Sequence, residues 1–215
     1  MERIDKVLAN FPRLAPDQRT PRDPVEELQE DRAELLRRDL NVSSMANTFE
    51  ALVEVPGMKS CIKAFKDFAS GAGKPFLLCY GGTGNGKTHL MEAAVISIYK
   101  SGRFARIIRF PEVLSALKRS MDKGAIPPYE VIMRNFRVGK MLLLDDVGMG
   151  HVDSQWANSV LEDIVCYRYS ERLPTVITTN KDITDLPERV ISRFKDRSVA
   201  VMCLNESPDY RPRKR

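Results

Sequence analysis

Residues 76–90 read FLLCYGGTGNGKTHL, and this stretch decides the fold class. The apolar run from Phe76 to Tyr80 predicts a buried strand, and a helix is expected from Lys87 onward. Between them, residues 81–88 fit the pattern G-x-x-x-x-G-K-[ST]. A glycine-rich turn between a strand and a helix points its backbone N–H groups inward, at the positive end of the helix. The stretch therefore predicts binding of a nucleoside triphosphate.

The side chains at the end of this loop have distinct expected roles. Lys87 is expected to hold the β- and γ-phosphates as a point charge, and the Thr88 hydroxyl is expected to ligate Mg²⁺. We assign ATP binding to Gly81, Gly82, Thr83, Gly84, Asn85, Gly86, Lys87, Thr88 and His89.

Strands and helices alternate on both sides of the loop. Further strands are predicted at 104–110, 141–144, 175–179 and 198–204. Helices are predicted at 58–70, 87–100, 111–121, 128–136, 154–172 and 187–194. Apolar strands bounded by helices indicate a sheet that is covered on both faces, hence a parallel sheet in an α/β protein.

Polar residues follow two of these strands. Asp145 and Asp146 come directly after the strand at 141–144, and Asn180 ends the strand at 175–179. A carboxylate at the end of a buried strand can hold the metal beside the phosphate loop, so Asp145 is expected to hold Mg²⁺. Asp146 is expected to orient the attacking water. The Asn180 amide can bond both the γ-phosphate and this water, although asparagine is also a common turn residue.

Two arginines near the end of the chain are spaced for one helical face. Arg189 and Arg193 are four residues apart in the segment 187–194. A guanidinium that reaches the γ-phosphate of a neighbouring subunit is an arginine finger, and we favour Arg193 over Arg189 for this role. A solvated basic face is the alternative interpretation.

Taken together, these elements resemble the AAA+ ATPases and, more closely, the DnaC/DnaI-type helicase loaders and their IstB-like transposition relatives. The resemblance runs from about residue 47 to residue 211. It is carried by Asn47-Thr48-Phe49, the Walker A motif at 81–88, the Walker B pair Asp145-Asp146, the sensor-1-like Asn180, the box at 188–193, and Asp209-Tyr210-Arg211.

The resemblance implies a three-layer sandwich around a five-stranded parallel sheet of order 5-1-4-3-2. It also implies ATP-dependent assembly into homo-oligomers and single-stranded DNA binding. Relatives bind DNA partly through extra helices after the second strand, a region that here carries the candidate DNA contacts Lys118, Arg119 and Lys123. A charged surface helix pair is the alternative for that region.

Three features depart from the family pattern. Asp146 stands where many AAA+ ATPases have glutamate, and its shorter side chain implies slow hydrolysis that suits a switch. Residues 205–215 are too few for a C-terminal helical lid, which agrees with the loader and transposition relatives. The N-terminal arm carries no cysteine, so a zinc-bearing helicase-docking domain is not expected there.

The first 44 residues differ from the rest in composition. They carry four prolines and an excess of acidic residues, and one helix is expected from Asp23 to about Leu40, with Asp23 as its N-cap. We predict an N-terminal arm at 1–44, which serves as a linker or a docking segment, and an AAA+ ATPase domain at 45–215.

Composition limits the class of protein further. The 215 residues include 34 Lys+Arg and 29 Asp+Glu, a net charge of +5, and 43% hydrophobic residues, which excludes disorder throughout. No apolar run approaches the roughly 20 residues needed to cross a membrane, and the N-terminus lacks a secretory signal. We expect a cytoplasmic protein.

The four cysteines fall at Cys61, Cys79, Cys166 and Cys203 with no C-x-x-C pair, so neither a zinc site nor a disulfide framework is expected. Small buried thiols in a reducing compartment are the simplest interpretation.

The sequence leaves two functions open. The first is an ATP-hydrolysing DnaC-like loader, or primosomal protein, whose partner is a replicative DNA helicase. The second is an IstB-like helper ATPase that assembles on DNA and recruits a transposase. A small-molecule kinase of the P-loop class is disfavoured because no acceptor-binding insertion is evident.

Overall fold

The computed structural model describes residues 24–148 and 154–209 of the 215-residue chain. The chain divides into two units after Leu35. Helix α2 spans Pro24–Leu40, while Asp23, expected as its N-cap, lies outside the described residues. Leu40 and Val42 belong to the core of the second unit. The division after residue 44 stays a prediction.

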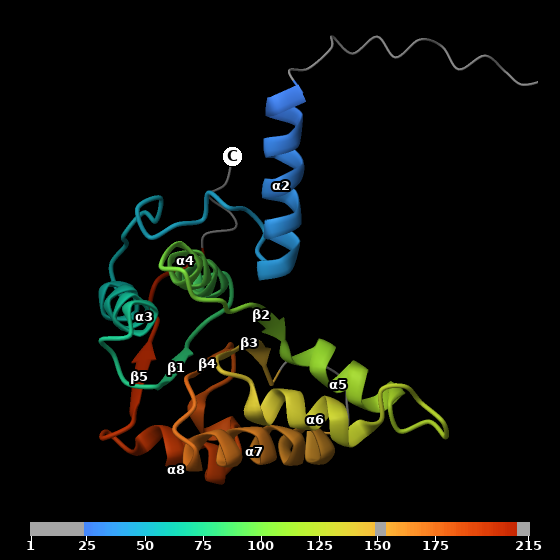
Figure 1. Cartoon of the computed structure of the whole chain (residues 1–215). Coiled ribbons are helices and arrows are strands. Elements are labelled where there is room, and N and C mark those ends of the chain that lie inside the picture. The colour runs from blue at the N-terminus through green and yellow to red at the C-terminus, as the bar shows by residue number, and fades with distance from the viewer. Residues whose placement is uncertain (1–23, 149–153, 210–215) are drawn as a thin grey trace, which may run out of the picture. The chain divides into compact units, whose positions relative to one another are not determined.

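A five-stranded parallel sheet forms the centre of the second unit (Figure 1). Its strands are β1 (Phe76–Tyr80), β2 (Ile107–Arg109), β3 (Leu142–Val147), β4 (Thr175–Thr179) and β5 (Ala200–Leu204). They lie in the order β2-β3-β4-β1-β5, which confirms the predicted order 5-1-4-3-2 read from the opposite edge. All four pairings are parallel, so every strand ends at the same edge of the sheet.

Helices cover both faces of the sheet, which gives the predicted three layers (Figure 1). One face carries α3 (Lys59–Ser70) and α4 (Lys87–Lys100). The other carries α5 (Phe110–Arg119), α6 (Tyr129–Val138), α7 (Ser154–Ser170) and α8 (Glu188–Lys195). Side chains of β1 alternate between the two cores, with Leu77 and Cys79 on the α3–α4 side and Phe76 and Leu78 on the other. Within the described residues, no helix combines the length and the apolar character that a membrane span requires.

Three strands differ in their bounds from the sequence prediction, and β5 differs only in that it begins at Ala200 and not at residue 198. The strand expected at 104–110 is reduced to β2, because Phe104 is exposed and Phe110 already begins α5, with Pro111 in its first turn. The strand expected at 141–144 continues through both aspartates to Val147. The register against β4 shifts between Leu144 and Val147, so the acidic residues sit in an irregular stretch of the strand.

A fully buried guanidinium joins α6, α7 and the start of β4. Arg168 Nη1 donates to the carbonyl oxygens of Phe136, Arg137 and Gly139, at the end of α6. Its other nitrogens donate to Pro174 O at 2.8 Å and Thr175 Oγ1 at 2.8 Å. Burial lowers the pKa of Arg168 to about 10, so the side chain stays charged at neutral pH. Carbonyl dipoles at the C-terminal end of α6 compensate this buried charge.

We expect Arg168→Met to destabilise the protein by about 3 kcal/mol, because it leaves several buried carbonyls without a donor. Urea unfolding followed by circular dichroism measures the change. Arg134→Met makes the same replacement at an exposed position of α6 and should shift stability by less than about 0.5 kcal/mol. Equal stability of the two variants would refute a structural role for Arg168.

Candidate nucleotide site

The phosphate loop, residues 81–88, runs from the end of β1 into the first turn of α4. Lys87 is buried, and its Nζ donates to Gly81 O at 2.9 Å, Gly82 O at 2.6 Å and Asn85 Oδ1 at 2.9 Å. Burial lowers the pKa of Lys87, and the nearby negative groups oppose this shift. The Lys87 ammonium thus donates to oxygens of the phosphate loop itself, and phosphate oxygens of a bound nucleotide are expected to take their place.

The segment after β5 holds the phosphate loop from outside. Asn85 Nδ2 donates to Asn205 O at 2.8 Å, and Asn205 Nδ2 donates back to Asn85 O at 2.8 Å. Ser207 Oγ donates to the same Asn85 oxygen at 2.9 Å. A Cβ at Gly81 would clash with Asn205 O, and one at Gly84 would clash with the Asp209 carboxylate. Close approach of the Asn205 backbone therefore requires glycine at Gly81, and positive φ favours glycine at both positions, since the Asp209 side chain beside Gly84 can move aside.

A carboxylate ties the phosphate loop to the two central strands. Asp145 is buried at the end of β3, and its Oδ2 accepts a hydrogen bond from Thr88 Oγ1 at 2.9 Å. Its Oδ1 accepts another from the Thr178 hydroxyl on β4. A hydroxyl and a carboxylate in contact are oxygen ligands that suit a small hard cation, so these residues fit Mg²⁺.

Asp146 and Asn180 lie together beside this carboxylate. Asp146 has φ +56°, a left-handed conformation uncommon for a residue other than glycine, at the irregular end of β3. Asn180 Nδ2 approaches Asp146 Oδ1 at 3.4 Å. The strained backbone turns the Asp146 carboxylate away from the buried position of Asp145 and toward the next strand end.

A cavity of about 460 Å³ brings these parts together. Its polar wall includes Lys87, Thr88, His89, Asp146 and Asn180. Its apolar wall belongs to the segment before α3 and consists of Ala51, Leu52, Val53 and Met58. A polar end beside an apolar end matches a ligand that has both phosphates and a flat base.

Glu92 on α4 fixes the segment that leads to the apolar wall. Its Oε1 accepts a hydrogen bond from Ser43 N at 2.8 Å, and its Oε2 accepts from Ser43 Oγ at 3.0 Å and from Asn47 Nδ2. Sequence reasoning missed Glu92, Asn205 and Ser207. Glu92 lies one turn beyond Thr88 in a helix, and the other two follow the last strand, so only three-dimensional contacts reveal them.

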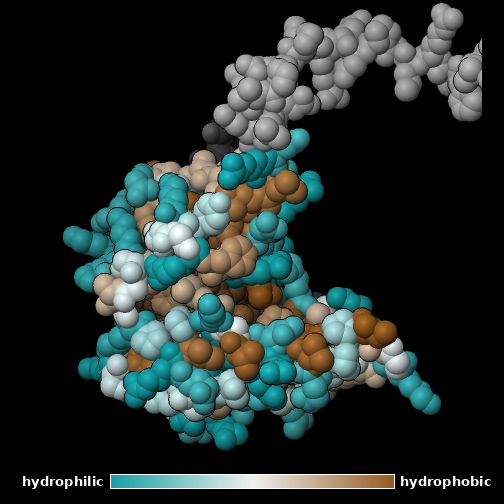
Figure 2. Space-filling view, viewed as in Figure 1, coloured by the Kyte–Doolittle hydropathy of each residue, from teal (hydrophilic) through white to brown (hydrophobic). Residues whose placement is uncertain are grey.

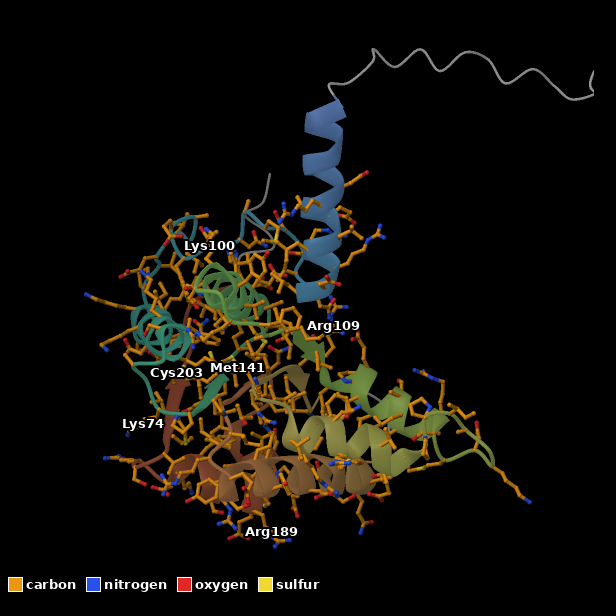
Figure 3. All side chains as sticks on the ribbon, in the orientation of Figure 1. Lys74, Lys100, Arg109, Met141, Arg189 and Cys203 are labelled. Atoms are coloured by element: carbon orange, nitrogen blue, oxygen red, sulfur yellow. The ribbon has the colours of Figure 1, made fainter. Side chains whose placement is uncertain are left out.

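The two arginines of α8 lie in different surroundings. Arg193 stacks on the Tyr169 ring, with Cζ 5.0 Å from the centroid, and its buried Nε finds no hydrogen-bond partner among the described residues. Arg189 points outward from α8 (Figure 3), with 71% of its side chain exposed and Nη1 3.7 Å from Glu162 Oε2. The finger assignment to Arg193 stays a prediction.

Lys118, Arg119 and Lys123 are exposed at the end of α5 and in the connection to α6. The face in Figure 2 is mainly hydrophilic, with separate apolar patches. Arg137 in the same region is engaged in an ion pair with Asp163, so it is less available to a ligand than the three exposed cations. Tyr210 and Arg211, part of the last motif of the resemblance, lie outside the described residues.

The strand order and the phosphate loop between β1 and α4 define a P-loop protein with the AAA+ ATPase fold. The crystal structure of the DnaC helicase loader superposes with a TM-score of 0.63 at 21% identity, covering 74% of this chain and 97% of that one. This likeness concerns the fold.

The chain belongs to the family described as IstB-like ATP binding protein, whose model matches residues 64–204. It is 26% identical to the replicative helicase loader DnaC of Buchnera aphidicola over 149 residues, 66% of this chain and 60% of that protein. It is also 26% identical to the replicative helicase loader DnaI of Bacillus subtilis over 119 residues, 55% of this chain and 36% of that protein. The chain thus matches only part of the length of these relatives.

We expect Asn205→Ala to weaken ATP binding about tenfold, because the hydrogen bond from Asn205 Nδ2 to Asn85 O is lost and Ser207 loses its acceptor, Asn205 Oδ1. Isothermal titration with a non-hydrolysable ATP analogue measures the dissociation constant. Glu206→Ala is the matched control, since its side chain is exposed and the neighbouring backbone is retained. Unchanged affinity in Asn205→Ala would show that the loop keeps its shape without the Asn205 side chain.

Proposed function

We propose that the chain binds ATP in the cavity beside the phosphate loop and hydrolyses it. The observation that carries this proposal is the convergence of Lys87, Thr88, Asp145, Asp146 and Asn180 at one edge of the sheet. The apolar wall receives the adenine, and Lys87 exchanges loop carbonyls for the β- and γ-phosphate oxygens. The phosphate loop supplies backbone N–H donors at the start of α4.

Thr88 and Asp145 hold Mg²⁺ in this proposal, and the bound ion neutralises charge on the phosphates. Asp146 accepts a proton from the attacking water or orients it, and Asn180 holds the same water against the γ-phosphate. The shorter carboxylate of Asp146 makes hydrolysis slow, which suits a protein that changes partners when ATP is spent.

The biological role that we propose is loading of a replicative DNA helicase. Two relatives that match half or more of this chain are named replicative helicase loaders, and the family match covers the whole sheet from β1 to β5. The proposal includes a cytoplasmic protein that forms an ATP-dependent homo-oligomer and binds single-stranded DNA. Lys118, Arg119 and Lys123 supply exposed positive charge for the DNA backbone.

Affinity purification from source-cell lysate with ATP tests this role. We expect the wild-type protein to recover a hexameric replicative helicase and Lys87→Ala to lose it. Lys87→Ala should weaken ATP binding at least about 30-fold, because one charge-assisted bond to phosphate contributes about 2 kcal/mol. Lys63→Ala is the control, since Lys63 is exposed on α3. Recovery of a transposase without a helicase would contradict the loader role and support the IstB-like alternative.

The arginine-finger assignment is tested by ATP turnover across protein concentration. We expect Arg193→Ala to keep ATP affinity and to lose the rise in turnover that accompanies oligomerisation, by roughly 100-fold or more. Arg189→Ala, one helical turn earlier, should retain that rise. Loss of the rise in Arg189→Ala but not in Arg193→Ala would assign the finger to Arg189. A full rise in both variants would show that α8 carries no arginine finger.

A further inference from the structure

Three of the four cysteines meet in the core on the α3 side of the sheet. Cys79 on β1 and Cys203 on β5 are direct register partners, and Cys61 on α3 faces them. The three Sγ atoms all lie within 4.8 Å of one another, and the Cys61 and Cys79 sulfurs are 3.9 Å apart. All three residues are buried, and Figure 3 labels Cys203 on β5.

This spacing matches three thiolates around one metal ion. Metal–sulfur bonds of about 2.3 Å in a trigonal plane place the sulfurs about 4.0 Å apart. Core cysteines that merely fill space need no mutual approach of this kind, whereas here each of the three sulfurs is near both others. The separation of the ligands in sequence, 18 and 124 residues, explains why no spacing motif signals the site.

The ligand set selects the ion. Among the described residues, the cluster contains three thiols and no histidine or carboxylate, so a structural zinc ion would lack its fourth ligand. Soft thiolates in an apolar, water-poor core favour a soft ion that accepts three sulfur ligands in a plane, and monovalent copper has these properties. Binding of one Cu⁺ by three thiolates releases three thiol protons to solvent and leaves net negative charge on the cluster, which the nearby Lys87 ammonium partly offsets, and the copper and the sulfurs keep their oxidation states.

We propose that Cys61, Cys79 and Cys203 form a three-thiolate binding site for monovalent copper. The copper site adjoins the nucleotide site along two strands. Cys79 is two residues before Gly81, and Cys203 is two residues before Asn205. The ion therefore joins α3 to the two strands whose ends carry the phosphate loop and its Asn205 contact. The bound ion cross-links these three elements in the folded protein. Because the three sulfurs come together only in the folded chain, copper binding stabilises the folded state.

Anaerobic titration of the reduced protein with Cu(I), in competition with a chromophoric Cu(I) chelator, tests the proposal. We expect one Cu(I) per chain, a sulfur-to-copper charge-transfer band in the ultraviolet, and a higher melting temperature. X-ray absorption of the wild-type complex should show three sulfur neighbours at about 2.3 Å, the metal–sulfur distance of such sites. This measurement needs no variant, so it stands even where a core substitution impairs folding.

Cys61→Ser and Cys203→Ser should each lose the chelator-resistant copper, as judged on variants that retain the wild-type circular dichroism spectrum. Cys166→Ser is the matched control and should keep it, because Cys166 lies on α7, outside the cluster. Transfer of all copper to the chelator, copper bound without three sulfur neighbours, or thiols lost to disulfide in place of a metal adduct would each overturn the proposal.

Discussion

The Asp145 carboxylate is the interaction on which the nucleotide site depends. It accepts hydrogen bonds from Thr88 at the start of α4 and from Thr178 on β4, while its own backbone belongs to β3. One buried anion thereby fixes the relative positions of the phosphate loop and the two central strands. A parallel sheet makes this possible, because it brings strand ends that are distant in sequence to one edge. Asp146 is the next residue of β3, and its left-handed backbone places its carboxylate beside Asn180.

Most of the fold follows from patterns visible in the sequence. The apolar runs predicted β1 and β4 to the residue, and the helix after the phosphate loop was predicted with the bounds of α4. The apolar pattern predicted the wrong bounds where apolar residues of a neighbouring loop or helix adjoin a strand. Phe104 and Phe110 extend the apolar run around β2, yet the first is exposed and the second belongs to α5. The strand was predicted to end at Leu144, but it continues through Asp145, whose carboxylate accepts hydrogen bonds from hydroxyls of neighbouring elements.

The candidate site could be predicted only where its residues are adjacent in sequence or follow a strand. The phosphate loop and Asp145 meet both conditions. Asn205 and Glu92 act through contacts made across 120 and 45 or more residues, which no local pattern contains. The cysteine cluster is the extreme case, because it depends on the register of β1 against β5 and on the face that α3 presents. Such features require the assembled sheet.

The internal bonding of Lys87 has a consequence for ligand selection. With three acceptors already satisfied, the ammonium gains little by exchanging them for a weakly charged or singly coordinated group. A ligand must present several anionic oxygens at once, spaced along the loop, before replacement becomes favourable. Inorganic phosphate and nucleoside monophosphates present fewer such oxygens than a triphosphate does. The bonds that Lys87 makes within the loop therefore favour a polyphosphate chain over a small single anion as the group that replaces them.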